Sequence, residues 1–297
     1  MNSDSTSAAL FRPATVIRDY WVLLKPRLSL LVAFSCAFGF ILSSTSDIRL
    51  FNLLIVTIGG FLLSGSSVVI NQILEVGEDG KMNRTMNRPL PTGRVSVRSA
   101  WWFAIVTFLV SMALLAYSTN KLTVVLSVVS MVLYSFVYTP MKKVGPAAVF
   151  VGAIPGALPP LLGWVGNTGM LSYEALVIFG IQFIWQFPHF WAIAWVSDED
   201  YRRAGFRLLP SGGGKDHNTA IQIMTYTLFL LPLGLLPAWI GLTGINSALV
   251  VTLCGVGFLA QTFSLMKTGS HQSAVRIMFG SFLYLPVVQI AYLLDKN

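Results

Sequence analysis

Nine apolar stretches, each of about 20 residues, constrain the fold of this chain more than any other feature of its sequence. A stretch of that length, wound as an α-helix, crosses the hydrocarbon core of a bilayer, which is roughly 30 Å thick. Only 11% of the residues are charged, whereas a soluble domain carries about 25%, so this chain could not cover a water-facing surface. The sequence therefore predicts an all-α integral membrane protein. The nine spans are expected at about 22–43, 51–73, 99–118, 121–139, 146–165, 174–196, 219–240, 244–266 and 274–294.

The basic residues indicate how these spans are oriented. Of the 20 Lys and Arg residues, 17 fall on one set of alternate connections, and only Arg49, Lys121 and Lys296 fall on the other. Cytoplasmic connections carry such an excess, which places the N-terminus in the cytoplasm and the C-terminus outside. The net charge of +8 therefore reflects orientation and not a nucleic-acid-binding surface.

The loops and termini complete the expected organisation. Residues 1–20 hold no apolar run and are expected to form a cytoplasmic N-terminal tail, followed by one domain over 21–297. The tail lacks an Arg-rich amphipathic presequence, which favours a bacterial plasma membrane. Two cytoplasmic connections, about 74–98 and 197–218, are long and densely charged, and loops of that size in a compact bundle are usually functional.

Three oxygen-bearing side chains recur at the cytoplasmic end of the second span. Asn71, Glu75 and Asp79 stand at i, i+4 and i+8, which places them on one face of a helix. A polar stripe facing lipid would cost several kcal/mol, so this face is expected to line a cavity. Oxygen ligands one turn apart suit Mg²⁺, which binds one or two carboxylates together with water and substrate phosphate.

Basic residues follow these acids directly. Lys81, Arg84 and Arg88 precede two prolines, Pro89 and Pro91, that end the helix. Acids beside a cluster of bases are typical of a site for a metal ion and a polyanion. The alternative is a solvated helix end with salt bridges and an orienting basic loop. An amide on the same face as both acids disfavours that alternative, because it has no orienting purpose.

A second acidic group ends the sixth span. Asp198, Glu199 and Asp200 are consecutive, and an isolated triplet of this kind is usually a solvated helix cap. Here the triplet lies at the cytoplasmic end of an even-numbered span, as do Glu75 and Asp79, the first acidic group. The two groups are therefore expected to meet in one cavity.

Two further segments supply candidate residues. His189 lies about two turns before the second acidic group, among aromatic residues. It either hydrogen-bonds within the bundle, contacts a bound ring or relays a proton. Tyr138, Lys142 and Lys143 close the fourth span on the same side as the acids. These lysines either obey the positive-inside rule or supplement the polyanion site.

The fifth span combines small residues with prolines. Gly152 and Gly156 have the small-xxx-small spacing that favours close approach of two helices. The prolines of this span predict a kinked helix beside a cavity and not a catalytic group.

From Asn71 to Arg94 the chain reads NQxxExxxDxxMxRTxxRPLPTGR, which resembles the first acidic motif of the UbiA superfamily of intramembrane prenyltransferases. The RTxxRPLPTGR extension is similar to that of one branch, the haem O synthases. Three further segments match this branch, namely YTPMKK at 138–143, GALPPLLGW at 156–164 and PHFWAIAW…EDYRRAGFRLLP at 188–210. The resemblance implies a UbiA-type bundle of nine helices around a central cavity open to the cytoplasmic side.

The resemblance also implies a reaction. Haem B (protohaem IX) becomes haem O when a farnesyl group passes from farnesyl diphosphate to a vinyl group, water adds and diphosphate leaves. By position in the motifs, the implied Mg²⁺ ligands are Asn71, Glu75, Asp79, Glu199 and Asp200. The implied diphosphate-binding residues are Lys81, Arg84, Arg88, Tyr138, Lys142 and Lys143. The implied catalytic residues are Asp79, Arg84, Arg88, His189 and Asp200, with His189 also a candidate for haem contact.

The sequence departs from the family pattern in three places. Glu75 stands where Asp is commoner, Ala148 replaces an Asn, and an EDY motif replaces the DxxxD of quinone-making relatives.

Other functions are alternatives to the farnesylation of haem B. The nearest is a related prenyltransferase that acts on an aromatic acid, a quinone precursor or chlorophyllide. A transporter would place its charges near the midplane and show inverted repeats, and neither feature is found. A structural subunit or haem chaperone would bind without catalysis. The expected partners are haem B, farnesyl diphosphate and the bilayer, with no nucleic acid; contact with haem A synthase or a terminal-oxidase assembly stays open.

Overall fold

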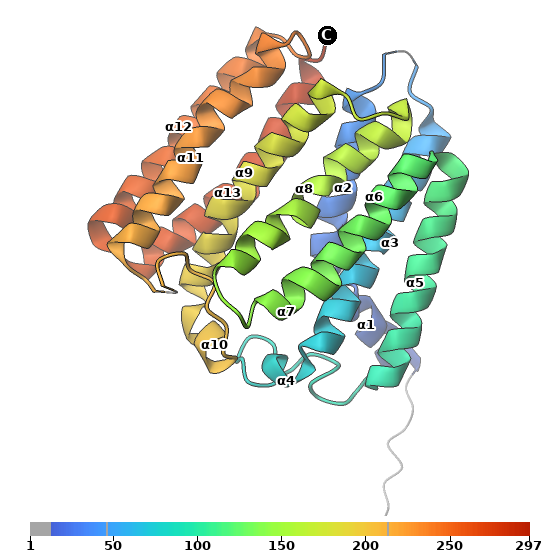
Figure 1. Cartoon of the computed structure of the whole chain (residues 1–297), viewed down its shortest axis with the longest axis vertical. Helices are drawn as coiled ribbons and strands as arrows, with labels where there is room; N and C mark the ends of the chain where they lie inside the picture. The colour runs from blue at the N-terminus through green and yellow to red at the C-terminus, as the bar shows by residue number, and fades with distance from the viewer. Residues whose placement is uncertain (1–12, 46, 213) are drawn as a thin grey trace, which may run out of the picture.

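A computed structural model describes residues 13–45, 47–212 and 214–297, which fold into a bundle of helices without a named strand (Figure 1). Residues 1–12 of the expected tail, including Arg12, lie outside the described residues, and residues 13–20 belong to a helix. The elements are α1 (Pro13–Leu23), α2 (Pro26–Leu42), α3 (Leu50–Leu74), α4 (Val76–Asp79), α5 (Val97–Ser118), α6 (Lys121–Val132), the π-helix η1 (Leu133–Tyr138), α7 (Thr139–Met141), α8 (Ala147–Thr168), α9 (Tyr173–Val196), α10 (Asp198–Arg203), α11 (His217–Trp239), α12 (Ile245–Thr268) and α13 (His271–Leu294).

The long helices correspond to the predicted membrane spans. Among the described residues, eight helices are long and apolar enough to cross a bilayer, counting α6, η1 and α7 as one. A ninth is counted when α1 and α2 are taken as a single span with a bend of 49°. The predicted all-α membrane fold is therefore confirmed, and each expected span overlaps one of these helices.

The apolar pattern of the sequence does not predict the form of the first span, which is broken into two helices. The chain breaks at Lys25, whose φ of 45° is the only positive value at a non-glycine residue in the described part of the chain. Pro26 explains the break, because its ring disfavours helical geometry at the residue before it and it has no N–H to donate. Helix α2 then starts afresh with Pro26 in its first turn, where proline is well tolerated.

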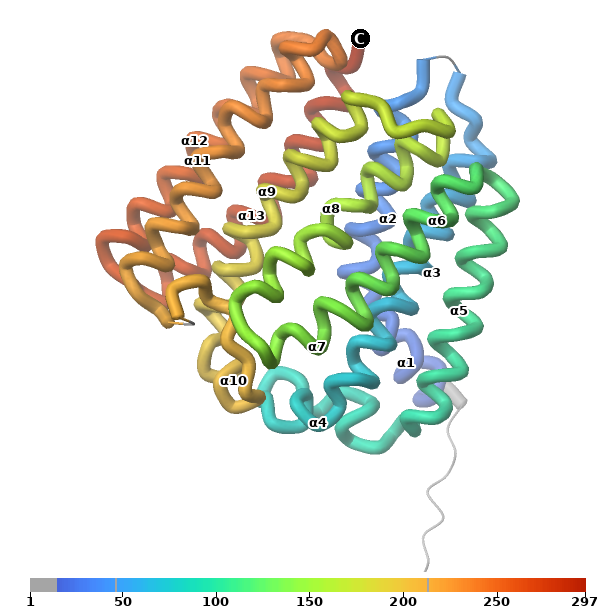
Figure 2. The backbone as a smooth tube through the Cα atoms, viewed as in Figure 1, coloured from blue at the N-terminus to red at the C-terminus, as the bar shows by residue number. Residues whose placement is uncertain are grey.

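The first described helix and the C-terminus lie at opposite ends of the bundle. Figure 1 shows α1 at the end where α4 and α10 lie, and the C-terminus at the other end. A chain that crosses a membrane nine times, an odd number, begins and ends on opposite sides of it. The tube in Figure 2 shows that the two long connections around α4 and α10 run side by side beneath the helices.

Side-chain caps explain where five of the helices begin. In each, the residue before the first turn has extended backbone, and its side chain accepts a hydrogen bond from an N–H that has no partner inside the helix. The capping residues of α5, α6, α9, α11 and α13 are Ser96, Asn120, Ser172, Asp216 and Ser270.

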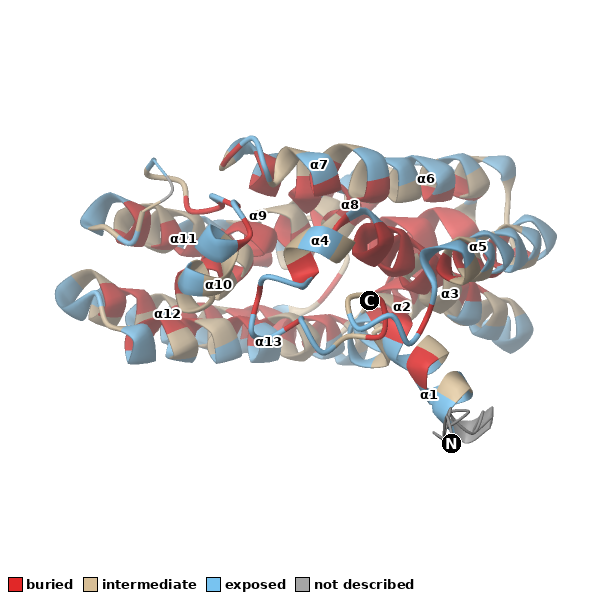
Figure 3. Cartoon of the chain, turned by 90° about the horizontal axis from the view of Figure 1, so that it is seen from below, coloured by how far each residue is buried: buried red, intermediate tan, exposed pale blue. Residues whose placement is uncertain are grey.

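Helices α2 and α8 cross at the centre of the bundle, where buried residues gather (Figure 3). A Cβ added at Gly39 would overlap the Pro160 carbonyl oxygen, and one added at Gly163 would overlap the carbonyl oxygen of Cys36. Only glycine allows the two backbones to come this close. Gly152 and Gly156, expected to serve this purpose, instead face the side chains of Tyr138 and Gln186.

We expect Gly163→Ala to destabilise the bundle, because the added methyl group forces α2 and α8 apart. Overpacking of this kind costs about 1–3 kcal/mol and should lower the thermal unfolding midpoint of the purified protein. Gly180→Ala is the matched control, since it lies in α9 and a Cβ there would meet nothing within 4 Å. Equal midpoints for the two variants would contradict the close crossing.

Candidate active site

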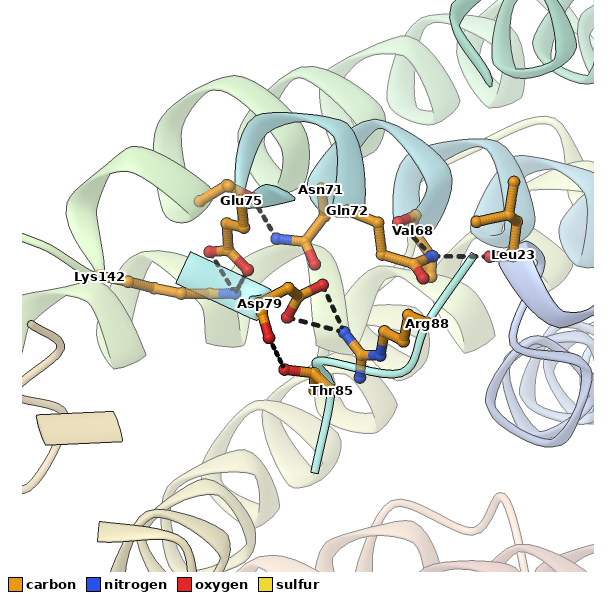
Figure 4. Close-up of polar contacts among 10 residues, drawn as sticks. Leu23, Val68, Asn71, Gln72, Glu75, Asp79, Thr85, Arg88 and Lys142 are labelled. Carbon is orange, nitrogen blue, oxygen red and sulfur yellow. Dashed lines mark hydrogen bonds and ion pairs between the residues drawn. The ribbon is translucent and has the colours of Figure 1, made fainter. Parts of the chain in front are cut away.

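The end of α3 places three polar side chains inside the protein. Asn71, Glu75 and Asp79 are 3%, 5% and 1% exposed, so the whole row is shielded from solvent (Figure 4). The α-helix is interrupted at Glu75, which lies between α3 and α4. The i to i−4 spacing nevertheless continues, because Glu75 N donates to Asn71 O and Asp79 N donates to Glu75 O. The expected polar face therefore persists across the break.

Each buried acid of this row is paired with a base. Lys142 Nζ lies 2.9 Å from Glu75 Oε1 and donates a hydrogen bond to Oε2 at 3.1 Å. Arg88 Nη1 donates to both oxygens of Asp79, at 3.0 and 2.8 Å. Because charges this deeply buried are costly unless paired, the two ion pairs hold bases and acids at one point of the bundle.

A π-helix positions Lys142 for this contact. Thr139 Oγ1 donates to the Tyr134 carbonyl and accepts a hydrogen bond from Asn71 Nδ2 at 3.0 Å. The wide turn of η1 thus couples the fourth span to the polar row of α3. Short π segments occur often at functional sites, and the apolar pattern used to predict the span gives no sign of this one.

The outer part of the site is more exposed. Lys143 Nζ lies 2.6 Å from Glu78 Oε1, and the lysine side chain is 52% exposed. Burial alone would raise the pKa of Glu78, but the hydrogen bond from Lys143 and the positive charges around it lower that pKa below its usual value. Lys81 is also exposed. Lys143 and Lys81 therefore lie at the rim of the site and not in its interior.

One residue of the second acidic group, Asp200, contacts the loop that follows α4. Asp200 accepts hydrogen bonds from the backbone N–H groups of Asn83 and Arg84, at 3.1 and 3.3 Å. The expected meeting of the two loops is therefore found, but Glu199 does not take part. Its side chain is 85% exposed and its nearest base is Arg203 at 4.0 Å. Among the described residues, the Glu199 carboxylate is paired with Arg203, which also pairs with Asp200, and it makes no contact with the polar row that it was expected to join.

Aromatic rings support two of the bases. The Arg84 guanidinium lies 5.1 Å from the centre of the Tyr201 ring, and Lys142 Nζ lies 4.8 Å from that of Tyr138. Both distances suit attraction between a cation and the face of a ring. Tyr138, expected to bind diphosphate, is buried and supports Lys142 through its ring.

Lys25 is a further candidate site residue, although from the sequence alone it is only one of the 17 basic residues on the cytoplasmic connections. It stands at the break between α1 and α2 and lies within Coulombic range of Arg88, Lys142, Asp79 and Glu75. Gln72 Nε2 holds the end of α1 in place by donating to the Leu23 carbonyl at 2.7 Å (Figure 4). The signal that could have identified Lys25 is the proline after it, which predicts a break in the helix.

An apolar cavity opens beside this polar cluster. Its lining includes Ser67 and Val68, one turn from Asn71 on α3, and Tyr134, one turn from Tyr138. Helices α2, α8, α9 and α13 supply most of the remaining surface, which is largely apolar. The cavity therefore lies in the membrane-spanning part of the bundle, one helical turn from the polar cluster.

Glutamine side chains form part of the polar lining of the cavity. Gln182 Nε2 and Gln186 Nε2 both donate to the Gly156 carbonyl at 2.9 Å. This carbonyl has no donor within its own helix, because the residue four positions later is Pro160. The prolines of the fifth span thus lie beside a cavity, and the glutamines satisfy a backbone group that they leave free.

The donor set of the polar row is suited to a hard cation. Among the described residues no three His, Cys, Asp or Glu side chains converge as a preformed metal centre. Glu75 Oε1 is buried and lies 2.9 Å from Lys142 Nζ, but it accepts no well-aligned hydrogen bond, so it keeps lone pairs for a cation. The amide oxygen of Asn71 and the carboxylate of Asp79 complete an all-oxygen set, which matches the preference of Mg²⁺ for few carboxylates together with ligand phosphate.

Comparison with known proteins relates this site to a family. The model of the UbiA prenyltransferase family matches residues 32–285. The chain is 48% identical over 95% of its length to the protoheme IX farnesyltransferase of Cytophaga hutchinsonii, of which it covers 99%. It is 40% identical over 95% of its length to the enzyme of the same name from Christiangramia forsetii, of which it covers 95%.

Solved structures share the fold at lower sequence identity. A digeranylgeranylglyceryl phosphate synthase aligns over 95% of this chain and 98% of its own, with a TM-score of 0.78 and 18% identity. A UbiA homologue from Archaeoglobus fulgidus, bound to DMAPP and Mg²⁺, aligns over 92% of this chain and 99% of its own, with a TM-score of 0.68 and 18% identity.

Proposed function

The chain belongs to the UbiA prenyltransferase family, and we propose that it farnesylates protohaem IX to form haem O. One observation carries the proposal at the level of the site. A buried row of acids, paired with Lys142 and Arg88, begins one helical turn from the lining of an apolar cavity. This is the arrangement that an allylic diphosphate requires, because its charged head and its apolar tail need opposite surroundings.

The reaction begins when the C1–O bond of farnesyl diphosphate breaks. The electron pair leaves with diphosphate, and an allylic carbocation forms at C1. Lys142, Arg88, Arg84 and Lys25 are proposed to bind the leaving group, because their positive charges stabilise the negative charge that develops on it. Arg88 and Lys142 would then exchange their carboxylate partners for phosphate oxygens.

Asn71, Glu75, Asp79 and Asp200 are proposed to hold Mg²⁺. When bound, the ion supplies further positive charge against the diphosphate. Structures of a family member from Archaeoglobus fulgidus hold Mg²⁺ or Cd²⁺, which supports a divalent cation here. Glu199 is not included in this set because its side chain is exposed and is paired with Arg203.

The vinyl group of the haem then attacks C1. The new C–C bond leaves a positive charge on the vinyl carbon next to the macrocycle, and water adds there with loss of a proton, which gives the hydroxyl group of haem O. The apolar lining of the cavity keeps water away from the farnesyl cation before this attack. His189 lines the same cavity and is proposed to contact the haem.

We test the function by incubating the purified protein with protohaem IX, farnesyl diphosphate and Mg²⁺, and measuring the mass of the product. The expected product carries one farnesyl group and one added water, and EDTA should prevent its formation. An aromatic acid or a quinone precursor offered as acceptor is the control. Prenylation of that acceptor, with protohaem left unchanged, would assign the chain to another branch of the family.

Conservative arginine substitutions separate phosphate binding from simple positive charge. Arg84→Lys and Arg88→Lys keep the charge but lose the planar guanidinium that grips phosphate with two N–H groups. Each should lower kcat/KM for farnesyl diphosphate by roughly 10–150-fold, or about 1.5–3 kcal/mol, while protohaem binding persists. Arg98→Lys is the control, because Arg98 lies in the first turn of α5, beyond the motif. Small, equal effects at all three positions would mean that the cluster only orients the protein.

The proposed location is a bacterial plasma membrane, with the site on the cytoplasmic side. Single cysteines at Thr45 and Met170, in connections opposite the site, should react with an impermeant reagent on intact cells. Single cysteines at Met86 and Val144, in exposed connections on the site's own side, should react only after lysis. The reverse pattern would invert the orientation that the charge distribution predicts.

A further inference from the structure

His189 is held in one tautomer by its neighbours. Its Nδ1 lies 2.9 Å from Ser281 Oγ, and that hydroxyl donates its only proton to the Met278 carbonyl at 2.6 Å. Ser281 can therefore only accept from His189, so Nδ1 carries the ring proton. The lone pair of a neutral imidazole is then on Nε2.

The orientation of the ring is fixed as well. Trp185 stacks on it, with ring centres 4.4 Å apart and planes 18° from parallel, and Trp185 Nε1 donates to the Ser281 carbonyl at 3.1 Å. Phe282 meets it edge-on, with ring centres 5.0 Å apart. The side chain thus has little freedom to turn Nε2 elsewhere.

The free nitrogen belongs to a cavity-lining residue. His189 is 9% exposed and lines the apolar cavity, and its Nε2 makes no hydrogen bond to any described residue. Nε2 is also absent from the buried polar atoms that lack a partner, so it is accessible from the cavity and can accept a bond from a bound molecule. Neutral imidazole whose other nitrogen donates to a fixed acceptor is the usual form of a metal-ligating histidine.

We propose that His189 Nε2 is the axial ligand of the iron in the protohaem substrate. This inference rests on the proposed function, since it assigns a ligand to the haem that the site is proposed to bind. Phe190, the next residue, packs against Tyr138, whose ring supports Lys142. Phe190 and Tyr138 therefore form a chain of aromatic contacts from the residue next to His189 to Lys142, one of the proposed diphosphate-binding bases.

Optical and magnetic spectra of the full-length protein with protohaem, and without any prenyl diphosphate, test the assignment. The wild type should show imidazole-ligated iron. His189→Gly should lose this signature and bind protohaem at least about 10-fold more weakly, and free imidazole should restore the signature by occupying the vacated space. His217→Ala and His271→Ala should resemble the wild type, because these residues begin α11 and α13 away from the cavity lining.

Ser281→Ala provides a second measurement that keeps the ligand itself. Loss of the acceptor for Nδ1–H should shift the iron–histidine stretching frequency and weaken protohaem binding by about 10-fold, and Ser281→Thr should restore both. A purely structural role for Ser281 would leave the frequency unchanged.

The outcomes distinguish this inference from the proposed function. If the wild type farnesylates protohaem but its spectrum is the same in His189→Gly, the axial-ligand assignment is wrong and His189 acts only in proton transfer or packing. A thiolate signature would overturn it in favour of Cys36, which also lines the cavity. If the wild type neither binds nor farnesylates protohaem, the proposed function fails first.

Discussion

Asp79→Asn should lower kcat/KM for farnesyl diphosphate by about 10²–10³-fold without preventing membrane insertion. Asp79 is 1% exposed, and both of its oxygens accept hydrogen bonds from Arg88. An amide keeps the shape of the side chain but removes its charge. The substitution therefore weakens cation binding and also releases Arg88 from the position in which it would meet diphosphate. Turnover by the purified variant, measured over a range of Mg²⁺ concentrations, is the appropriate assay.

Asp19→Asn is a matched control for the loss of an ion pair. Asp19 is 8% exposed and is paired with Arg94 at 3.2 Å, where it joins α1 to the loop before α5. This substitution should reduce stability and leave the kinetics close to wild type. Near-normal turnover of Asp79→Asn at low Mg²⁺ would mean that the first acidic motif does not bind the cation. Equal kinetic losses in both variants would reduce the role of Asp79 to folding.

The membrane fold could be predicted from the sequence because it depends on only a few sequence features. The length of each apolar stretch sets the span, and side-chain caps such as Ser96 and Ser172 set where helices start. The break at Lys25 has a local cause in Pro26 and could have been predicted on the same grounds. The close approach at Gly39 and Gly163 could not, because the residues that meet across a crossing depend on how two helices pack.

The candidate site was predictable to the level of its residue types and its end of the bundle. The spacing of Asn71, Glu75 and Asp79 survives a helix break, since backbone hydrogen bonds continue across it. The partners of these residues could not be assigned, because they come from α7, the residue that follows it and the loop after α4. Glu199 and Asp200 show the difficulty most clearly. They are neighbours of the same chemistry, yet one faces solvent and the other binds the first loop.

The adjacent residues Lys142 and Lys143 should behave very differently when each is replaced by Gln. Each lysine is paired with an acid, so the sequence and the ion pairs alone would predict equal effects on catalysis when either is replaced. Burial separates them, because the side chain of Lys142 is 11% exposed and that of Lys143 is 52% exposed. Exposed ion pairs contribute about 0–1 kcal/mol, whereas removal of one partner from a buried pair costs about 3–5 kcal/mol.

We therefore expect Lys142→Gln to lower kcat/KM by about 10²–10³-fold and Lys143→Gln to change it by no more than about 5-fold. Part of the first loss would be structural, since Glu75 is left buried without a counter-charge. The double variant Lys142→Gln/Glu75→Gln removes both charges and should recover thermal stability but not turnover. Recovery of turnover together with stability would show that Lys142 only neutralises Glu75. In that case Arg84, Arg88 and Lys25 would have to bind the diphosphate without it.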